Sequence, residues 1–135
     1  MKFPAVLGLL LVLVGTAASA ERVSELCEIT FSHDSASMPL GVNHKLVEVA
    51  AWAKGNSDGL IVLDGHADPS GQSAKDIELA LQRAKAVRDR LVKVGVDPEQ
   101  IVIAAFGADS AKLDGNARVV VWGTRQDVNA IIAGR

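Results

Sequence analysis

The sequence has few aromatic residues, no tyrosine, one cysteine and no excess of positive charge. Aromatic residues make up 4% of the 135 residues, and 14 Lys and Arg residues stand against 16 Asp and Glu residues. Proteins that bind nucleic acid without sequence preference combine a cationic surface with aromatic side chains that stack on bases. The composition offers neither feature, so we expect no nucleic-acid partner. A single cysteine also excludes an internal disulfide, so the core must stabilise the fold.

The first twenty residues have the pattern of a secretory signal peptide. Lys2 precedes an apolar run over residues 5–14, and residues 18–20 read Ala-Ser-Ala. The run is short for a membrane-spanning helix, so a retained anchor is the weaker alternative. Cleavage after Ala20 would leave residues 21–135 as one domain. Loss of Lys2 reduces 14 cations to 13 against 16 anions, a net charge of −3. We expect export, with no membrane insertion after cleavage.

Cys27 lies beyond the predicted cleavage site, in a polar context unlike that of a lipoprotein cysteine. Position 21, directly after the small residues, is Glu21. Cys27, Ile29 and Phe31 alternate with polar residues, which predicts a strand with these three side chains on its apolar face. This phase favours a buried, inert thiol. An intermolecular disulfide is the alternative for an exported protein with an odd cysteine.

Hydrophobic periodicity predicts an α+β fold of β-α-β-α-β-β order, with two helices packed on a mixed four-stranded sheet. The predicted elements, in chain order, are residues 26–31, 42–54, 60–63, 73–94, 101–106 and 118–122. Only a loop joins the last two strands, which favours an antiparallel pair. Residues 123–135 are expected to form a short tail with a helical turn around residues 128–132.

The densest polar cluster, residues 64–71, directly follows the strand predicted to be most buried. This loop carries Asp68, and the helix after it carries Arg83. A carboxylate and a guanidinium in one cleft would complement a zwitterion, because the carboxylate accepts from an ammonium and the guanidinium holds a carboxylate. The ordinary alternative is a loop residue and a solvated helix residue with a surface ion pair. Residue types alone leave both interpretations open.

The segments around this cluster resemble the OmpA-like peptidoglycan-binding domain family. That family shows G-[HY]-[TA]-D-x-x-G and then L-S-x-x-R-A-x-x-V on a helix. This chain has Gly-His-Ala-Asp at residues 65–68, Gly71, and Leu-Ala-Leu-Gln-Arg-Ala-Lys-Ala-Val at residues 79–87. Residues 29–36, 95–101 and 106–119 match further family segments in the same order. The resemblance covers about residues 26–122 and implies the fold described above.

The resemblance also implies a function and a site. Family members bind peptidoglycan non-covalently, without catalysis, metal or cofactor, through the diaminopimelate group of the stem peptide. By position, Asp68 would accept from the ammonium of this group and Arg83 would hold its carboxylate, as the residue types also suggest. The other residues of the implied site are Gly65, His66, Ala67, Asp76, Asn116 and Arg118.

Four positions depart from the family pattern. Ala67 stands where Thr is frequent, Asp76 where Asn is frequent, Ala80 in place of Ser, and Ala117 in place of Arg. We interpret Asp76 as a first-turn residue that forms a capping box with Ser73. We expect these changes to preserve the fold and to alter affinity and stem-peptide preference.

Enzyme activity is the first alternative function. Asp64, His66 and Asp68 alternate as D-x-H-x-D, which is a conceivable set of metal ligands, but no second histidine cluster accompanies them. The other two histidines, His33 and His44, lie in a different segment without metal-site spacing. No G-x-S-x-G motif marks a serine nucleophile, and the strand phase buries Cys27. We therefore expect no catalysis and no metal site.

An interaction subunit of an envelope complex is the second alternative. Such a secretion or motility subunit would keep the fold, have weak or lost peptidoglycan binding, and contact its partner through another surface, such as residues 123–135. Retention of both Asp68 and Arg83 favours peptidoglycan binding instead. We expect a periplasmic protein, associated with the cell wall or outer membrane of a Gram-negative bacterium, that anchors itself or another envelope protein to the wall.

Overall fold

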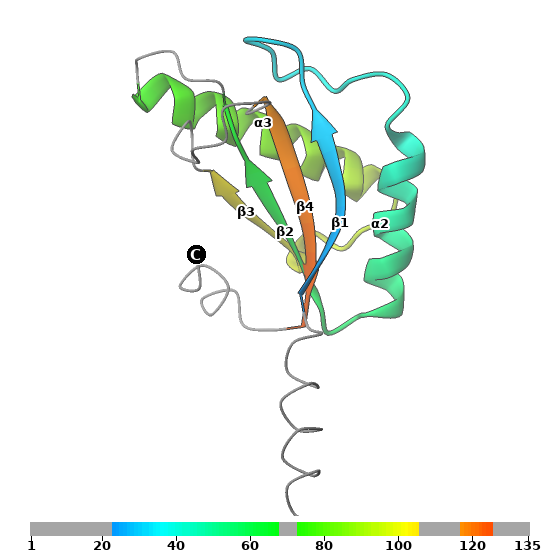
Figure 1. Cartoon of the computed structure of the whole chain (residues 1–135). Helices are drawn as coiled ribbons and strands as arrows, with labels where there is room; N and C mark the ends of the chain where they lie inside the picture. The colour runs from blue at the N-terminus through cyan, green and yellow to red at the C-terminus, as the bar shows by residue number, and fades with distance from the viewer. Residues whose placement is uncertain (1–22, 68–72, 106–116, 126–135) are drawn as a thin grey trace, which may run out of the picture.

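The computed structural model describes residues 23–67, 73–105 and 117–125. They form the predicted order of elements (Figure 1). The elements are β1 (Val23–Thr30), α2 (Asn43–Gly55), β2 (Leu60–Gly65), α3 (Ser73–Lys93), the 3-10 helix η1 (Pro98–Gln100), β3 (Ile101–Ala105) and β4 (Arg118–Thr124). The predicted fold class is confirmed, and β1 begins three residues earlier than its apolar alternation indicated. The helical turn expected in the tail lies outside the described residues.

The four strands form one mixed sheet in the order β1-β4-β2-β3. Strand β4 lies antiparallel to both β1 and β2, and β2 lies parallel to β3. The prediction that the last two strands pair was wrong, because β2 lies between them. The apolar run Val119–Val121 explains this position: all three residues are buried, as expected for a central strand covered on both faces. The long connection between β3 and β4 allows the chain to cross β2.

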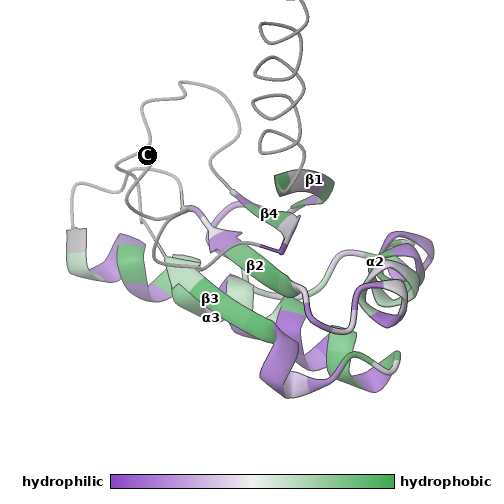
Figure 2. Ribbon diagram, turned by 90° about the horizontal axis from the view of Figure 1, so that it is seen from below, coloured by the Kyte–Doolittle hydropathy of each residue, from purple (hydrophilic) through white to green (hydrophobic). Residues whose placement is uncertain are grey.

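Both helices pack on one face of the sheet (Figure 2). Side chains alternate between the two faces of each strand, so every second one points toward the helices. The helices cover these side chains and exclude almost all water from them. The centre of this core consists of Ile29, Leu46, Val49, Ile61, Leu63, Val87, Leu91, Val119 and Val121, each at most 1% exposed. Burial of such aliphatic side chains contributes roughly 1.5–3 kcal/mol each.

Small residues allow α3 to lie very close to β2. A Cβ atom added to Gly65 would lie 2.2 Å from the carbonyl oxygen of Ala80 on α3. Ala80 and Ala84 are themselves fully buried. Glycine at residue 65 therefore fixes the distance between the end of β2 and the first half of α3, which is where the predicted site residues lie.

At the end of the sheet away from Gly65, one side chain, Gln100, donates hydrogen bonds to backbone carbonyl groups. The Gln100 side-chain amide donates to the carbonyl oxygens of Ala53, Asn56 and Gly59 over 3.2–3.3 Å. These carbonyls lie at the end of α2 and in the turn before β2, where helical partners are missing. Gln100 thereby ties α2 to the start of β3.

Cys27 is half-buried on β1 and packs against the core. Burial raises the pKa of its thiol to about 11, although the nearby Lys45 ammonium acts in the opposite direction. The thiol is therefore protonated and unreactive at neutral pH, as its strand phase predicted. Neither helix in the described part of the chain has the length and apolarity needed to cross a bilayer.

We expect Gly65→Ala to lower the free energy of unfolding by about 1–3 kcal/mol or more, because the new methyl group would collide with the α3 backbone. Gly55→Ala is the matched control, since a Cβ there meets no atom within 4 Å. Urea unfolding followed by circular dichroism measures both variants. Equal stability of the two variants would contradict the close packing of α3 on β2.

Candidate functional site

Arg83 is the centre of the candidate site, and it is fully buried. Its Nε donates to the carbonyl oxygen of Ser35 over 2.8 Å, Nη1 to that of His66 over 3.0 Å, and Nη2 to that of Ser32 over 3.1 Å. Its Cζ also lies 5.6 Å from the centre of the Phe31 ring. One guanidinium therefore holds together α3, the end of β2 and the loop between β1 and α2.

This environment excludes the solvated surface position that was one interpretation of Arg83. A charge removed from water costs several kcal/mol unless it is paired or hydrogen-bonded. Three carbonyl dipoles supply part of that compensation, and they fix the plane of the guanidinium. A carboxylate that reaches this region would meet an oriented guanidinium in a medium of low polarity.

The end of β2 carries three of the predicted site residues, Gly65, His66 and Ala67, and all three are buried. The His66 N–H donates to the carbonyl oxygen of Arg118 over 2.9 Å, which extends the pairing of β2 with β4 beyond Gly65. The His66 carbonyl also accepts from Arg83, and His66 is two residues before Asp68 in the sequence. Asp68 itself lies outside the described residues.

Asp76 lies in the first turn of α3 and is 5% exposed. It precedes Arg83 by seven residues, close to two helical turns, so both residues belong to one face of α3. The hydrogen bond from Arg83 to the His66 carbonyl joins α3 to the end of β2, and the assigned role of Asp76 stays a prediction. The Ser73 side chain and Asn116 lie outside the described residues, so the capping box and the assigned role of Asn116 stay predictions.

Arg118 points to the opposite face of the sheet from Arg83. Its neighbour Val119 belongs to the core beneath the helices, and side chains alternate along a strand. Arg118 is 7% exposed, and its Nη1 lies 3.9 Å from Oε1 of Glu28. Its Nε is buried without a hydrogen-bond partner in the described structure. Only the Arg118 backbone, through its bond with His66, adjoins the Arg83 cluster.

Asp64, the first residue of the D-x-H-x-D pattern, accepts a hydrogen bond from the Trp122 indole N–H over 3.1 Å. Asp64 is 3% exposed and lies on the same face of the sheet as Arg118. In the described ranges, no group of three or more His, Cys, Asp or Glu side chains has the arrangement of a metal site. The hydrogen bond between Asp64 and Trp122 had no signal in the sequence, because 58 residues separate the two positions.

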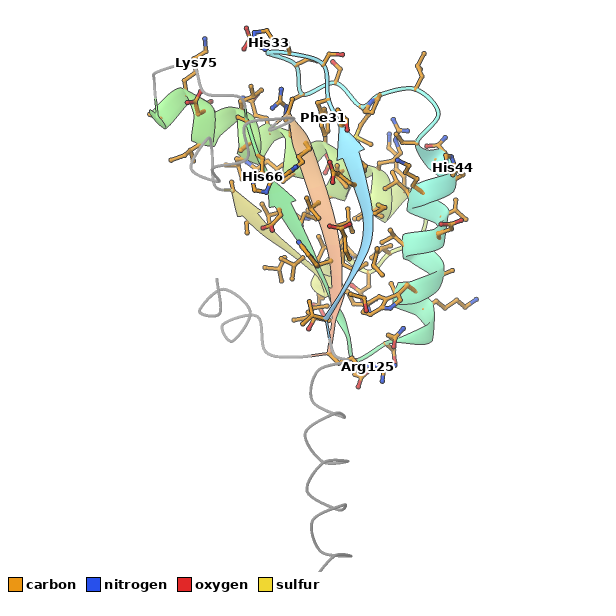
Figure 3. The ribbon with its side chains drawn as sticks, in the orientation of Figure 1. Phe31, His33, His44, His66, Lys75 and Arg125 are labelled. Atoms are coloured by element: carbon orange, nitrogen blue, oxygen red, sulfur yellow. The ribbon has the colours of Figure 1, made fainter. Side chains whose placement is uncertain are left out.

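A groove of about 340 Å³ opens beside the Arg83 cluster, and it was not predicted. Its lining residues are Asp34, from the loop after β1, and Lys75, Glu78, Leu79 and Gln82, from the first half of α3. Figure 3 shows that the labelled residues Phe31, His33, His66 and Lys75 gather at one end of the molecule, and that Arg125 lies at the other. The groove and the Arg83 cluster therefore share one end of the domain.

We expect Arg83→Ala to lower the free energy of unfolding by about 2–4 kcal/mol, because it removes the donor to the buried carbonyl of His66 and the donors to the part-buried carbonyls of Ser32 and Ser35. Arg88→Ala, at an exposed position of the same helix, should change stability by less than about 0.5 kcal/mol. Denaturant midpoints of the two variants test this. An Arg83→Ala variant as stable as Arg88→Ala would refute the structural role.

Comparison with known proteins relates the chain to proteins of the bacterial envelope. It is 32% identical over 81 residues to the peptidoglycan-associated lipoprotein of Mesorhizobium japonicum, and the match covers 60% of this chain and 48% of the relative. It is 33% identical over 95 residues to the peptidoglycan-binding protein ArfA of Mycobacterium tuberculosis, which covers 67% of this chain and 29% of that protein. The chain thus spans about half or less of the length of these two relatives.

Solved structures of similar fold include the peptidoglycan-associated lipoprotein from Burkholderia pseudomallei, with a TM-score of 0.60, 28% identity, and coverage of 76% of this chain and 91% of that chain. The OmpA-like domain of FopA1 from Francisella tularensis has a TM-score of 0.64 at 21% identity, covering 72% of this chain and 70% of that chain, which shows the fold alone. The model of the OmpA family matches residues 30–121, so the chain belongs to the OmpA family.

Proposed function

We propose that this protein binds peptidoglycan non-covalently through the diaminopimelate group of the stem peptide. Membership of the OmpA family and similarity to relatives named as peptidoglycan-associated or peptidoglycan-binding support this function. The observation that carries the proposal is the position of Arg83, whose guanidinium donates to the carbonyl oxygen of His66, the residue two positions before Asp68 in the sequence. A fixed cation held this near to Asp68 in the sequence suits a ligand group that carries both an ammonium and a carboxylate.

In this proposal the two charged residues have distinct roles. Arg83 holds the diaminopimelate carboxylate, and Asp68 accepts hydrogen bonds from the ammonium. Little reorganisation is needed on binding, because hydrogen bonds already orient Arg83 in the free protein. Gly65, His66 and Ala67 form the chain segment that ends at the Arg83 hydrogen bond, and Arg118 supports this segment because its carbonyl oxygen accepts from the His66 N–H. Asp76 lies two helical turns before Arg83 on α3.

Binding of this kind requires no metal, cofactor or catalytic group, and we propose that the protein is not an enzyme. Its role is to anchor itself or another envelope protein to the cell wall. The pattern of the first twenty residues supports a periplasmic location.

A second candidate function is that of an interaction subunit of an envelope complex. One surface favours it: a groove of about 590 Å³ along α2, where Val47, Ala50, Ala51 and Ala53 lie beside Val94, and Lys54, Asp97 and Gln100 supply the polar lining. Val47 is 55% exposed, although α2 already buries Leu46 and Val49 in the core. A surface helix normally has one apolar face, so this second face favours a protein contact.

Co-sedimentation with diaminopimelate-containing sacculi tests the proposed function. We expect the chain from Glu21 to sediment and Asp68→Asn to lower its affinity at least tenfold, since a charge-assisted hydrogen bond contributes about 1.5–3 kcal/mol. Asp58→Asn, in the exposed turn before β2, is the matched control and should bind as the unmodified chain does.

Two results would contradict the proposal. Asp68→Asn that binds like Asp58→Asn would refute the assigned site. A folded chain that does not sediment would refute wall binding and favour the interaction subunit. Asp68 is preferable to Arg83 for this test, because an Arg83 variant also loses structural hydrogen bonds.

A further inference from the structure

The groove lined by Asp34, Lys75, Glu78, Leu79 and Gln82 adjoins the proposed diaminopimelate site but is not part of it. The four α3 residues lie on the outer side of the helix, whereas Asp76 and Arg83 face inward and are buried. Lys75, Glu78, Gln82 and Asp34 are exposed, and Leu79 is half-buried. The groove is therefore a polar, open channel with an apolar floor.

Arg83 connects this groove to the proposed site. Its Nε and Nη2 donate to the carbonyl oxygens of Ser35 and Ser32, which lie on either side of Asp34 in the chain. The Ser35 N–H also donates to the Ser32 carbonyl over 3.1 Å and closes a tight turn around Asp34. The same guanidinium that would hold the diaminopimelate carboxylate thus fixes the loop wall of the groove against α3.

Both hydrogen-bond donors and acceptors line the groove. Lys75 and the Gln82 amide can donate, and the carboxylates of Asp34 and Glu78 can accept. Asp34 Oδ2 lies 3.4 Å from His33 Nε2, and Glu78 Oε1 lies 3.5 Å from the Gln82 amide nitrogen. The Asp34 carboxylate is therefore already in contact with the His33 ring, and the Glu78 carboxylate already accepts from the Gln82 amide.

Lys75 is the one cation among the five lining residues. In the described part of the chain, its ammonium has no ion pair or hydrogen bond. It is therefore the group best placed to pair with a carboxylate of a bound molecule.

We propose that this groove binds the part of the stem peptide that precedes diaminopimelate, with Lys75 paired to the free α-carboxylate of the γ-linked glutamate. This inference rests on the proposed function. Amide groups of a peptide offer both N–H donors and C=O acceptors, and the groove lining offers partners for both. One free carboxylate in this part of the stem matches one available cation. A ligand that occupies two adjoining sites gains affinity because the second contact is intramolecular.

Isothermal titration calorimetry of the chain from Glu21 with three probes tests the inference. The probes are meso-diaminopimelate, the tripeptide L-Ala-γ-D-Glu-meso-diaminopimelate, and the same tripeptide with the glutamate carboxylate amidated. We expect the tripeptide to bind about fivefold more tightly than diaminopimelate, as one exposed ion pair allows. Amidation should remove this advantage. Lys75→Met should remove it too, leave diaminopimelate affinity unchanged, and have no further effect on the amidated tripeptide.

Lys93→Met, in the last turn of α3, is the matched control and should keep the full advantage of the tripeptide. Equal affinities for diaminopimelate and the tripeptide would overturn the groove assignment while leaving the proposed function intact. A Lys75→Met variant that keeps the tripeptide advantage would overturn it too. A folded chain that binds none of the three probes would overturn the proposed function, and the groove assignment with it.

Discussion

The three hydrogen bonds from Arg83 to backbone carbonyls are the interaction on which this end of the domain depends. They connect residues 17, 48 and 51 positions apart in the sequence, and so they join α3 to β2 and to the loop after β1. The close packing of α3 on β2, which glycine at residue 65 permits, brings the helix near enough for this contact. The sheet, the helix and the loop are thereby fixed relative to one another around a buried cation.

A buried cation of this kind links stability to recognition. Backbone carbonyl dipoles offset part of its desolvation and orient the guanidinium. An anionic ligand group therefore meets a cation that is already in place. The same hydrogen bonds define the wall of the groove that carries Lys75. One residue thus organises both the proposed diaminopimelate site and the adjoining groove.

Periodicity was enough to predict the elements, because strands and helices of this chain bury one face and expose another. The central position of β4 was not predicted, since the loop between the last two strands carries no signal for strand order. The resemblance singled out Arg83, yet its partners were missed because backbone carbonyls have no side-chain signature. The hydrogen bond between Asp64 and Trp122 was missed because it depends on the register of β2 and β4.

Nuclear magnetic resonance of arginine side chains would test the role of Arg83 most directly. We expect the Arg83 Nε–H resonance to be protected from exchange with water in the free protein, unlike that of the exposed Arg88. The resonance should shift on saturation with meso-diaminopimelate and stay in place on addition of 1,5-diaminopentane, which has no carboxylate. Rapid exchange in the free protein, or a resonance that meso-diaminopimelate leaves unchanged, would contradict the role of Arg83 in both folding and binding.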